Sequence, residues 1–345
     1  MAIVNTILTL KDLPTPPEGK TGWPWTEQTE PFPDKMPDGS EWPRITIVTP
    51  SYNQGQFIEE TIRSVLLQGC PNLEYIIIDG GSTDNSIEII KKYEPYLAYW
   101  ISEPDRGQSH ALNKGFCRVT GRLVGWQNSD DYYHPKALLY AAQALSIFSD
   151  ADVFYGNLNH VDENRGLLFS CKIEQFELKN MLPWQCIFNQ SSFFKKELFQ
   201  EVNFLNETKQ HIMDYDFFWR LILSGYRFKF IPEIVASYRE HSNTKGNTQT
   251  DIADREFFEE YKFLYKETDL NSDVKEKILN CMLNCCLNDF WKLKLGTFRK
   301  HVREVITISG LNHLRIELIL KYLISFTGSK NILFIKLLIQ NPNKY

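Results

Sequence analysis

Four short polar clusters stand out in the first 131 residues, because their side chains could bind a ligand or take part in catalysis. They read SYNQGQ at 51–56, DGGSTD at 79–84, EPDRG at 103–107 and NSDD at 128–131. Carboxylates in such clusters have three common uses: they coordinate a metal ion, accept hydrogen bonds from sugar hydroxyls or take up a proton. Each cluster therefore holds candidate binding or catalytic residues.

Asp130 and Asp131 are adjacent, so their negative charges repel each other unless a cation or hydrogen-bond donors neutralise them. A divalent ion that also binds a diphosphate would do this, because Mg²⁺ and Mn²⁺ prefer oxygen ligands and phosphates. Alternatively, Asp131 caps the helix that Pro135 opens. The pair predicts a metal site, and helix capping is the competing interpretation for Asp131.

Asp79 precedes Gly80 and Gly81, and a carboxylate there can accept hydrogen bonds from a base or a ribose. The two glycines would let the backbone approach a ligand closely. A Gly-Gly turn also forms without any ligand, so Asp79 alone indicates little. The chain has neither a GxGxxG loop after its first strand nor a GxxxxGKS/T phosphate-binding loop.

Alternating strand and helix patterns position these clusters. Apolar strands are predicted at 44–49, 73–79, 98–102 and 122–127, and helices at 57–69, 86–94, 111–119 and 135–148. This rhythm predicts an α/β fold with a mostly parallel sheet flanked by helices. Ligands of such sheets bind at the carboxyl ends of the strands. Because each polar cluster follows a strand, we expect all four clusters to converge on one rim.

The chain divides by composition into a Pro/Trp-rich arm at 1–43, a catalytic domain at 44–245 and a helical region at 246–345. Within the later chain, two short strands are expected around Pro232. The arm's tryptophans, at positions 23, 25 and 42, suit packing over a folded body or stacking on carbohydrate. The apolar C-terminal helices with interspersed lysines suggest peripheral membrane contact, with packing on the protein itself as the alternative.

Composition excludes several classes of protein. The 345 residues are 43% hydrophobic with a net charge of -5, which argues against wholesale disorder and against nucleic-acid binding. The seven cysteines include no CxxC pair, which favours buried thiols in a reducing compartment. The first 20 residues lack the pattern of a signal peptide, and no run of 18 uncharged apolar residues occurs. We therefore expect a cytoplasmic protein, with any membrane contact at the inner face of the cell membrane.

An ordered set of motifs between residues 44 and 245 resembles the family 2 glycosyltransferases. The matching segments are TPSYNQGQFIEETIRSVLLQ, EYIIIDGGSTDNS, SEPDRGQSHALNKGF, TGRLVGWQNSDDYYHP, MDYDFFWRL and YREHS. The resemblance implies the A-type glycosyltransferase fold. It also implies transfer of a sugar from a nucleoside-diphosphate donor, usually a UDP-sugar, with inversion at the anomeric carbon.

The resemblance also implies residue roles on the donor side. Pro50 and Tyr52 would line the pocket for the base, and Asp79 would bond the base. Arg106 would approach the base or the diphosphate. Asp130 stands at the family's metal and ribose position.

Further roles follow for the metal and the acceptor. Asp130, Asp131 and His241 would lie at the Mn²⁺ or Mg²⁺ site. Asp214 aligns with the catalytic base, although a helix N-terminal carboxylate is the alternative. Trp126 and Gln190 are candidates for the acceptor or donor-sugar side. Trp184 is a further stacking candidate, and core packing is the alternative for both tryptophans.

Two departures from the family pattern leave alternatives open. Where the family often has Asp-x-Asp, this chain has Asn128-Ser129-Asp130, so either aspartate could hold the metal. Met213 stands where many members have Glu. The expected function is a metal-dependent hexosyltransferase acting on a saccharide or lipid-linked acceptor in cell-surface polysaccharide synthesis. The alternative is a nucleotide-sugar-binding protein without catalysis.

Overall fold

The computed structural model describes residues 7–173, 175–183, 185–248, 250–313, 316–326 and 332. The chain forms two compact units. The first comprises Met1–Glu177 and Gln185–Thr250, and the second comprises Leu178–Trp184 and Asp251–Tyr345. The first unit thus contains the arm together with the predicted catalytic range, except for residues 178–184, which belong to the second unit. The functional division of the chain at residues 43 and 245 stays a prediction.

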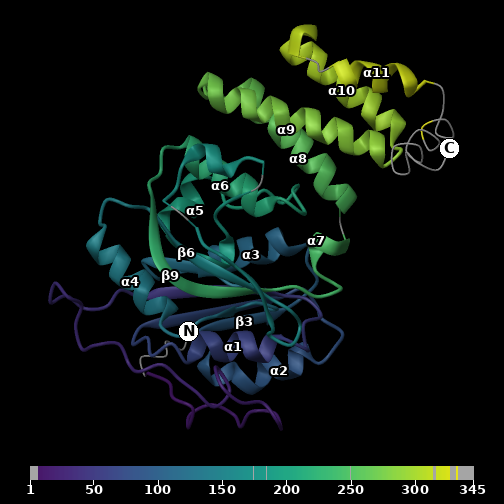
Figure 1. The fold of residues 1–345 in the computed structure, drawn as a ribbon. Helices are drawn as coiled ribbons and strands as arrows, with labels where there is room; N and C mark the ends of the chain where they lie inside the picture. The colour runs from purple at the N-terminus through teal and green to yellow at the C-terminus, as the bar shows by residue number, and fades with distance from the viewer. Residues whose placement is uncertain are drawn as a thin grey trace. The chain divides into compact units, whose positions relative to one another are not determined.

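A nine-stranded mixed sheet forms the centre of the first unit (Figure 1). Its strands are β1 Ile45–Ser51, β2 Leu73–Asp79, β3 Tyr99–Ser102, β4 Leu123–Trp126, β5 Tyr132–Tyr133, β6 Val153–Val161, β7 Leu167–Cys171, β8 Ser192–Lys195 and β9 Phe228–Arg239. The spatial order is β3-β2-β1-β4-β8-β6-β9-β5, and β7 pairs with β6. The first four strands in this order are parallel, as are β6 and β9, whereas β8 runs antiparallel to both neighbours. The predicted α/β class with a mostly parallel sheet is confirmed.

Helices cover both faces of this sheet because the buried strands are apolar on both sides. The helices of the first unit are α1 Ile58–Leu66, α2 Ser86–Tyr93, α3 Gln108–Phe116, α4 Ala137–Ile147, α5 Glu197–Glu201, α6 Met213–Leu223 and α7 Lys245–Thr248. Ile45 and Ile47 of β1 belong to one core cluster with α1, α2 and α4. Val48 points to the opposite face, where Gly115 of α3 lies so close that an added Cβ would stand 2.4 Å from its Cγ1. Glycine therefore lets α3 approach the sheet closely.

The strand around Pro232 differs from expectation. Two short strands were predicted there, but β9 runs as one strand from Phe228 to Arg239. Its pairing with β6 shifts register between Gly156 and Leu158, opposite the proline. A register irregularity accommodates a proline because the local ladder hydrogen bond is already missing.

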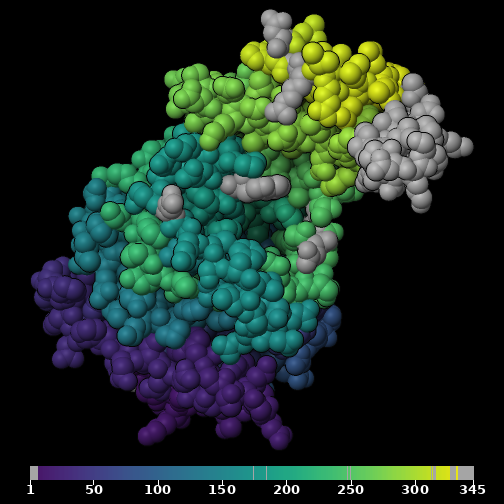
Figure 2. Space-filling model, viewed as in Figure 1, coloured from purple at the N-terminus to yellow at the C-terminus, as the bar shows by residue number. Residues whose placement is uncertain are grey.

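The N-terminal arm packs as part of the first unit (Figure 2). Its three tryptophans are buried: Trp23, Trp25 and Trp42. The indole N–H of Trp23 donates to the carbonyl oxygen of Tyr133 over 2.8 Å. Packing, rather than an open stacking surface, is therefore what the arm's tryptophans provide in this structure.

A buried arginine of α1 holds the arm in place. Arg63 is fully buried, and its guanidinium donates to the carbonyl oxygens of Pro14, Pro24 and Trp25 at 2.8, 3.1 and 3.1 Å. It also donates to the hydroxyl of Tyr93 over 3.1 Å. A buried charge is tolerated only when it is well hydrogen-bonded, so Arg63 and the arm depend on each other.

Replacing Arg63 with methionine is expected to lower the free energy of unfolding by about 3–5 kcal/mol, because three arm carbonyls lose a charged donor. Denaturant titration measures this loss, and limited proteolysis reports whether the arm detaches. Lys91→Met, at an exposed position on α2, is the matched control. An Arg63 variant as stable as this control would contradict the anchoring role.

The second unit is helical. Its helices are α8 Thr250–Glu267, α9 Ser272–Trp291, α10 Leu295–Ser309 and α11 Ile316–Ile324. His301 and Asp289 form a buried pair at 2.7 Å between α10 and α9, and the ring of Phe258 on α8 stacks on His301. Over the described part of the chain, no helix is both long and apolar enough to cross a membrane.

Candidate active site

The four polar clusters meet along one edge of the sheet, as the sequence predicts. Ser51 at the end of β1 pairs with Asp79 at the end of β2, and Asp79 pairs with Ser102 at the end of β3. These three strands therefore end level with one another. Trp126 ends β4 beside Val48 of β1, and the NSDD turn continues from there toward the same rim.

Asp79 shapes the loop that follows it. Its buried carboxylate accepts hydrogen bonds from the backbone N–H groups of Gly81 and Ser82 at 3.1 and 2.9 Å. It also accepts from the hydroxyls of Ser82 and Ser102 at 2.5 and 2.7 Å. Gly81 has φ +83°, a conformation that favours glycine. Asp79 thus fixes the course of the Gly80–Gly81 turn.

The other residues expected to meet the base differ in exposure. Tyr52 is largely exposed, and its ring lies 3.4 Å from where a Cβ on Gly80 would stand. Pro50 is buried within β1. Arg106 is exposed and forms an ion pair with Glu207 at 2.5 Å. An exposed ion pair of this kind contributes little to stability, so the guanidinium can change partners at small cost.

The two adjacent aspartates have different surroundings. Asp131 is fully buried and accepts hydrogen bonds from the backbone N–H of Arg239 at 2.8 Å and from the amides of Gln190 and Asn128 at 3.0 Å each. Burial raises the pKa of Asp131 to about 8, and the neighbouring charge of Asp130 acts in the same direction. Its oxygens face donors of the protein rather than solvent.

Asp130 lies at the surface of the same turn. Its side chain is 20% exposed, and its Oδ2 lies 3.1 Å from Nε2 of the buried His241. A carboxylate oxygen and an imidazole nitrogen are both metal-ligating atoms. No group of three or more His, Cys, Asp and Glu side chains that could hold a metal occurs in the described residues. An ion bound by Asp130 and His241 would also need phosphate oxygens of a substrate, as Mg²⁺ in phosphate-transfer sites usually does.

Asp214 lies in the first turn of α6 and is partly buried. Its Oδ2 accepts a hydrogen bond from the side-chain amide of Gln185 over 2.7 Å, and its Oδ1 accepts one from the backbone N–H of Tyr215 over 2.9 Å. The other carboxylate of this turn, Asp216, is paired at 2.8 Å with Arg220 four residues later. Asp216 is therefore neutralised by an arginine of its own helix, whereas the side chain that contacts Asp214 is an uncharged amide.

The start of α3 links α6 to the aspartate turn. Gln108 donates to the side-chain oxygen of Asn128 over 2.8 Å, and its own side-chain oxygen accepts from Lys245 over 2.7 Å. The hydroxyl of Ser109 lies 2.9 Å from the sulfur of Met213, next to Asp214. Through these contacts, the first turn of α3 joins the elements that carry Asp130 and Asp214.

Trp126 and Gln190 are both buried and hydrogen-bond to the turn at residues 128–131. Trp126 is 1% exposed, packs against Phe116 and donates its indole N–H to Asn128 over 2.9 Å. The sugar-stacking role considered for Trp126 therefore has no exposed ring face to act through. Gln190 is buried and holds Asp131. Trp184 lies outside the described residues.

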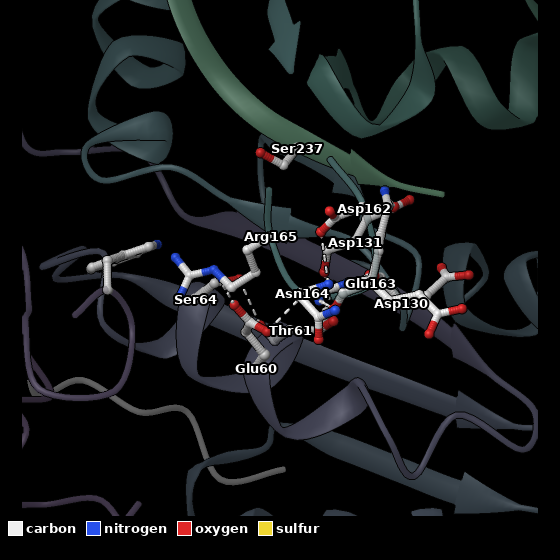
Figure 3. Close-up of polar contacts among 12 residues, drawn as sticks. Glu60, Thr61, Ser64, Asp130, Asp131, Asp162, Glu163, Asn164, Arg165 and Ser237 are labelled. Atoms are coloured by element: carbon white, nitrogen blue, oxygen red, sulfur yellow. Dashed lines mark hydrogen bonds and ion pairs between the residues drawn. The ribbon is translucent and has the colours of Figure 1, made fainter. Parts of the chain in front are cut away.

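Arg239 is a site residue that sequence reasoning missed. It is buried, its Nε donates to the carbonyl oxygen of Asp130 at 2.8 Å, and its backbone N–H donates to Asp131. Its Nη2 pairs with Glu60 of α1 at 2.9 Å, and Arg165 pairs with the other oxygen of Glu60 at 3.1 Å. Figure 3 shows Glu60 and Arg165 beside the turn that carries Asp130 and Asp131. The available signal was the arginine two residues before His241 in YREHS.

The family resemblance implies Mn²⁺-dependent donor binding, and Arg239→Lys is expected to weaken such binding by about 10- to 100-fold, as loss of a residue that orients metal ligands does. Lysine keeps the positive charge but lacks the planar guanidinium, which donates to Asp130 through Nε and pairs with Glu60 through Nη2 at the same time. Calorimetric titration of UDP at several Mn²⁺ concentrations measures the change. Arg165→Lys is the matched control, because Arg165 pairs with Glu60 without contacting the aspartates. Equal losses in both variants would mean that Arg239 acts only through general stability.

Comparison with known proteins agrees with this geometry. A family model described as "Glycosyl transferase family 2" matches residues 46–202. Glycosyltransferase GlyG of Streptococcus pneumoniae is 28% identical over 228 residues, covering 61% of this chain and 75% of GlyG. An uncharacterised glycosyltransferase of Mycobacterium tuberculosis is 31% identical over 167 residues, and the match covers 46% of this chain and 62% of the length of that relative.

Two solved structures share the fold. S. aureus TarS 1-349 in complex with UDP has a TM-score of 0.59 at 19% identity, covering 82% of this chain and 89% of that one. A mannosyltransferase from Pyrobaculum calidifontis, in complex with GDP-Man and Mn²⁺, has a TM-score of 0.52 at 18% identity, covering 81% and 80%. The sequence motifs agree with these matches, which identify residues 46–202 as a family 2 glycosyltransferase segment, and the two solved structures share the fold.

Proposed function

We propose that this glycosyltransferase moves a sugar from a UDP-sugar to a hydroxyl of a saccharide or lipid-linked acceptor, with inversion, in the synthesis of a cell-surface polysaccharide. The observation that carries the proposal is the single rim that joins the Asp79 loop, the first turn of α3 and the Asp130–His241 pair. The relatives of this fold that were solved with UDP and with GDP-Man support a nucleotide-sugar donor.

The donor would lie along the rim with its base at the loops after β1 and β2. Tyr52, whose ring is exposed, would contact the base directly, and Pro50, buried within β1, would support that loop from beneath. Asp79 contributes by fixing the glycine turn against which the base rests. Arg106 would exchange Glu207 for the diphosphate, because a guanidinium binds phosphate oxygens well.

Asp130 and His241 would hold a Mn²⁺ or Mg²⁺ ion, and Asp131 would stay behind them as part of the turn that fixes Asp130. When bound, such an ion stabilises the negative charge that develops on the leaving diphosphate. The α3 N-terminus lies beside the same turn through Gln108 and Asn128, and its backbone N–H groups favour an anion there.

Asp214 would act as the general base. Its carboxylate lies in the first turn of α6, and Gln185 orients it through Oδ2. It would remove the proton from the acceptor hydroxyl as the oxygen attacks the anomeric carbon. One displacement on the face opposite the leaving group inverts the configuration.

The test is transfer or hydrolysis by the full chain with a panel of UDP- and GDP-sugars in the presence of Mn²⁺ or Mg²⁺. Turnover of a donor, with an inverted product by NMR, is the expected result. Nucleotide binding without turnover of any donor would favour the alternative, a nucleotide-sugar-binding protein without catalysis. Absence of both binding and turnover would overturn both readings.

A further inference from the structure

The helix α11 has one apolar face that is exposed among the residues the structure describes. Its exposed side chains are Ile316, Ile319, Leu320 and Leu323, at 77%, 39%, 54% and 61%. Residues spaced i, i+3, i+4 and i+7 lie along one side of a helix, so these four form a continuous stripe. We call this stripe the α11 face.

The opposite side of α11 is already used for packing. Leu318 and Ser325 are buried, at 2% and 1% exposure, and the carbonyl of Ser325 accepts a hydrogen bond from Arg299 of α10 over 2.8 Å. The helix is therefore anchored in the second unit by one side and presents apolar residues on the other. Contiguous exposed apolar surface of this kind marks an interaction site more often than chance.

Cations and aromatic rings adjoin the α11 face. The guanidinium of Arg299 lies 5.1 Å from the centroid of Phe326, which is 59% exposed. Arg303, also on α10, donates to the hydroxyl of Tyr322 over 2.9 Å. An apolar stripe bordered by arginines and amphipathic rings matches the layers of a lipid surface, where acyl chains lie beneath charged headgroups.

The C-terminal part of the sequence is also rich in basic residues. Residues 295–345 carry eight Lys and Arg side chains and only two Asp and Glu, although the whole chain has 38 basic and 43 acidic residues. Each basic residue near an anionic bilayer contributes on the order of 1 kcal/mol of attraction. The C-terminal region is therefore cationic on an otherwise acidic protein.

We propose that the α11 face binds the surface of an anionic lipid bilayer, with Arg299 and Arg303 among the headgroups. A second copy of the chain is the less favourable occupant, because a two-fold contact through this face would bring two cationic surfaces together. The inference concerns binding by the second unit and does not depend on the transferase activity.

Vesicle co-sedimentation of the full chain tests the proposal. We expect binding to vesicles with about 30% phosphatidylglycerol to exceed binding to pure phosphatidylcholine by at least about tenfold, and to weaken in about 0.5 M NaCl. Leu320→Glu with Leu323→Glu is expected to lower binding at least tenfold, because two charges enter the apolar layer. Ile147→Glu with Leu167→Glu is the matched control, since these side chains are 65% and 61% exposed on the first unit.

The outcomes separate the possible occupants. The proposal holds if the Ile147→Glu/Leu167→Glu variant binds vesicles like wild type and the Leu320→Glu/Leu323→Glu variant does not. Both double variants must also have the same thermal unfolding temperature and the same affinity for UDP. Equal vesicle binding by the two pairs would overturn it, as would no preference for anionic lipid. A wild-type dimer that only the α11 pair dissociates, without vesicle binding, would assign the face to a second copy instead.

Discussion

Asp214→Asn is expected to lower kcat by about 10²- to 10⁴-fold, the usual contribution of a positioned general base. Asparagine has nearly the same shape, and its side-chain oxygen can still accept the hydrogen bond that Tyr215 or Gln185 donates to Asp214. It cannot accept a proton from the acceptor hydroxyl. Because Asp214 contacts none of the residues assigned to the donor, the Kd for UDP should stay unchanged while kcat falls. Steady-state kinetics at saturating donor, with calorimetry of UDP binding, measures both.

Asp216→Asn is the control for this prediction, because it changes the same helical turn without removing the proposed base. It breaks the ion pair with Arg220, so a lower unfolding temperature is expected. Its kcat at a temperature where it is folded should resemble that of wild type. Wild-type kcat in Asp214→Asn would show that Asp214 is only a favourable charge at a helix N-terminus.

The second large effect is expected from Asp130→Asn. Loss of a metal ligand removes several kcal/mol of charge stabilisation in the transition state, so kcat/KM should fall on the order of 10³-fold. The dependence of UDP binding on Mn²⁺ should disappear as well, because Asp130 and His241 are the two side chains proposed to hold the ion. Calorimetric titrations with and without Mn²⁺ provide the measurement.

Asp131→Asn separates the two aspartates. Asp131 accepts hydrogen bonds from three donors in a fully buried position, so an amide NH₂ there would face another donor. Such a mismatch costs about 1–3 kcal/mol of stability. We expect reduced stability with Mn²⁺ dependence retained. The assignment would be reversed if a well-folded Asp131→Asn lost the dependence and Asp130→Asn kept it.

The rim of the site could be predicted from sequence because its cause is local. Each of β1, β2 and β4 is a short apolar run with a polar cluster directly after it, and parallel strands must end at the same edge. The positions of Asp79 and Asp130 at or after strand ends follow from this pattern, whereas the role of Asp214, in the first turn of α6, was inferred from the family resemblance. No long-range contact was needed to place them.

The surroundings of those residues could not be predicted in the same way. Arg239 reaches Asp131 across 108 residues of sequence, and Gln190 reaches it across 59. The burial of Trp126 depends on Phe116 from a neighbouring helix. Such features arise from tertiary packing, and periodicity within one segment does not report them. The different surroundings of Asp130 and Asp131 are therefore visible only in the folded structure.

The attachment of the arm also orders events during synthesis on the ribosome. Trp23 finds its hydrogen-bond acceptor at Tyr133, 110 residues later in the chain. At translation rates of about 5–20 residues per second, the arm must wait roughly 5–20 s before that partner has been made. During this interval the Trp23 indole N–H lacks its native acceptor. The first segment to be synthesised thus cannot complete its native contacts until residue 133 has been made.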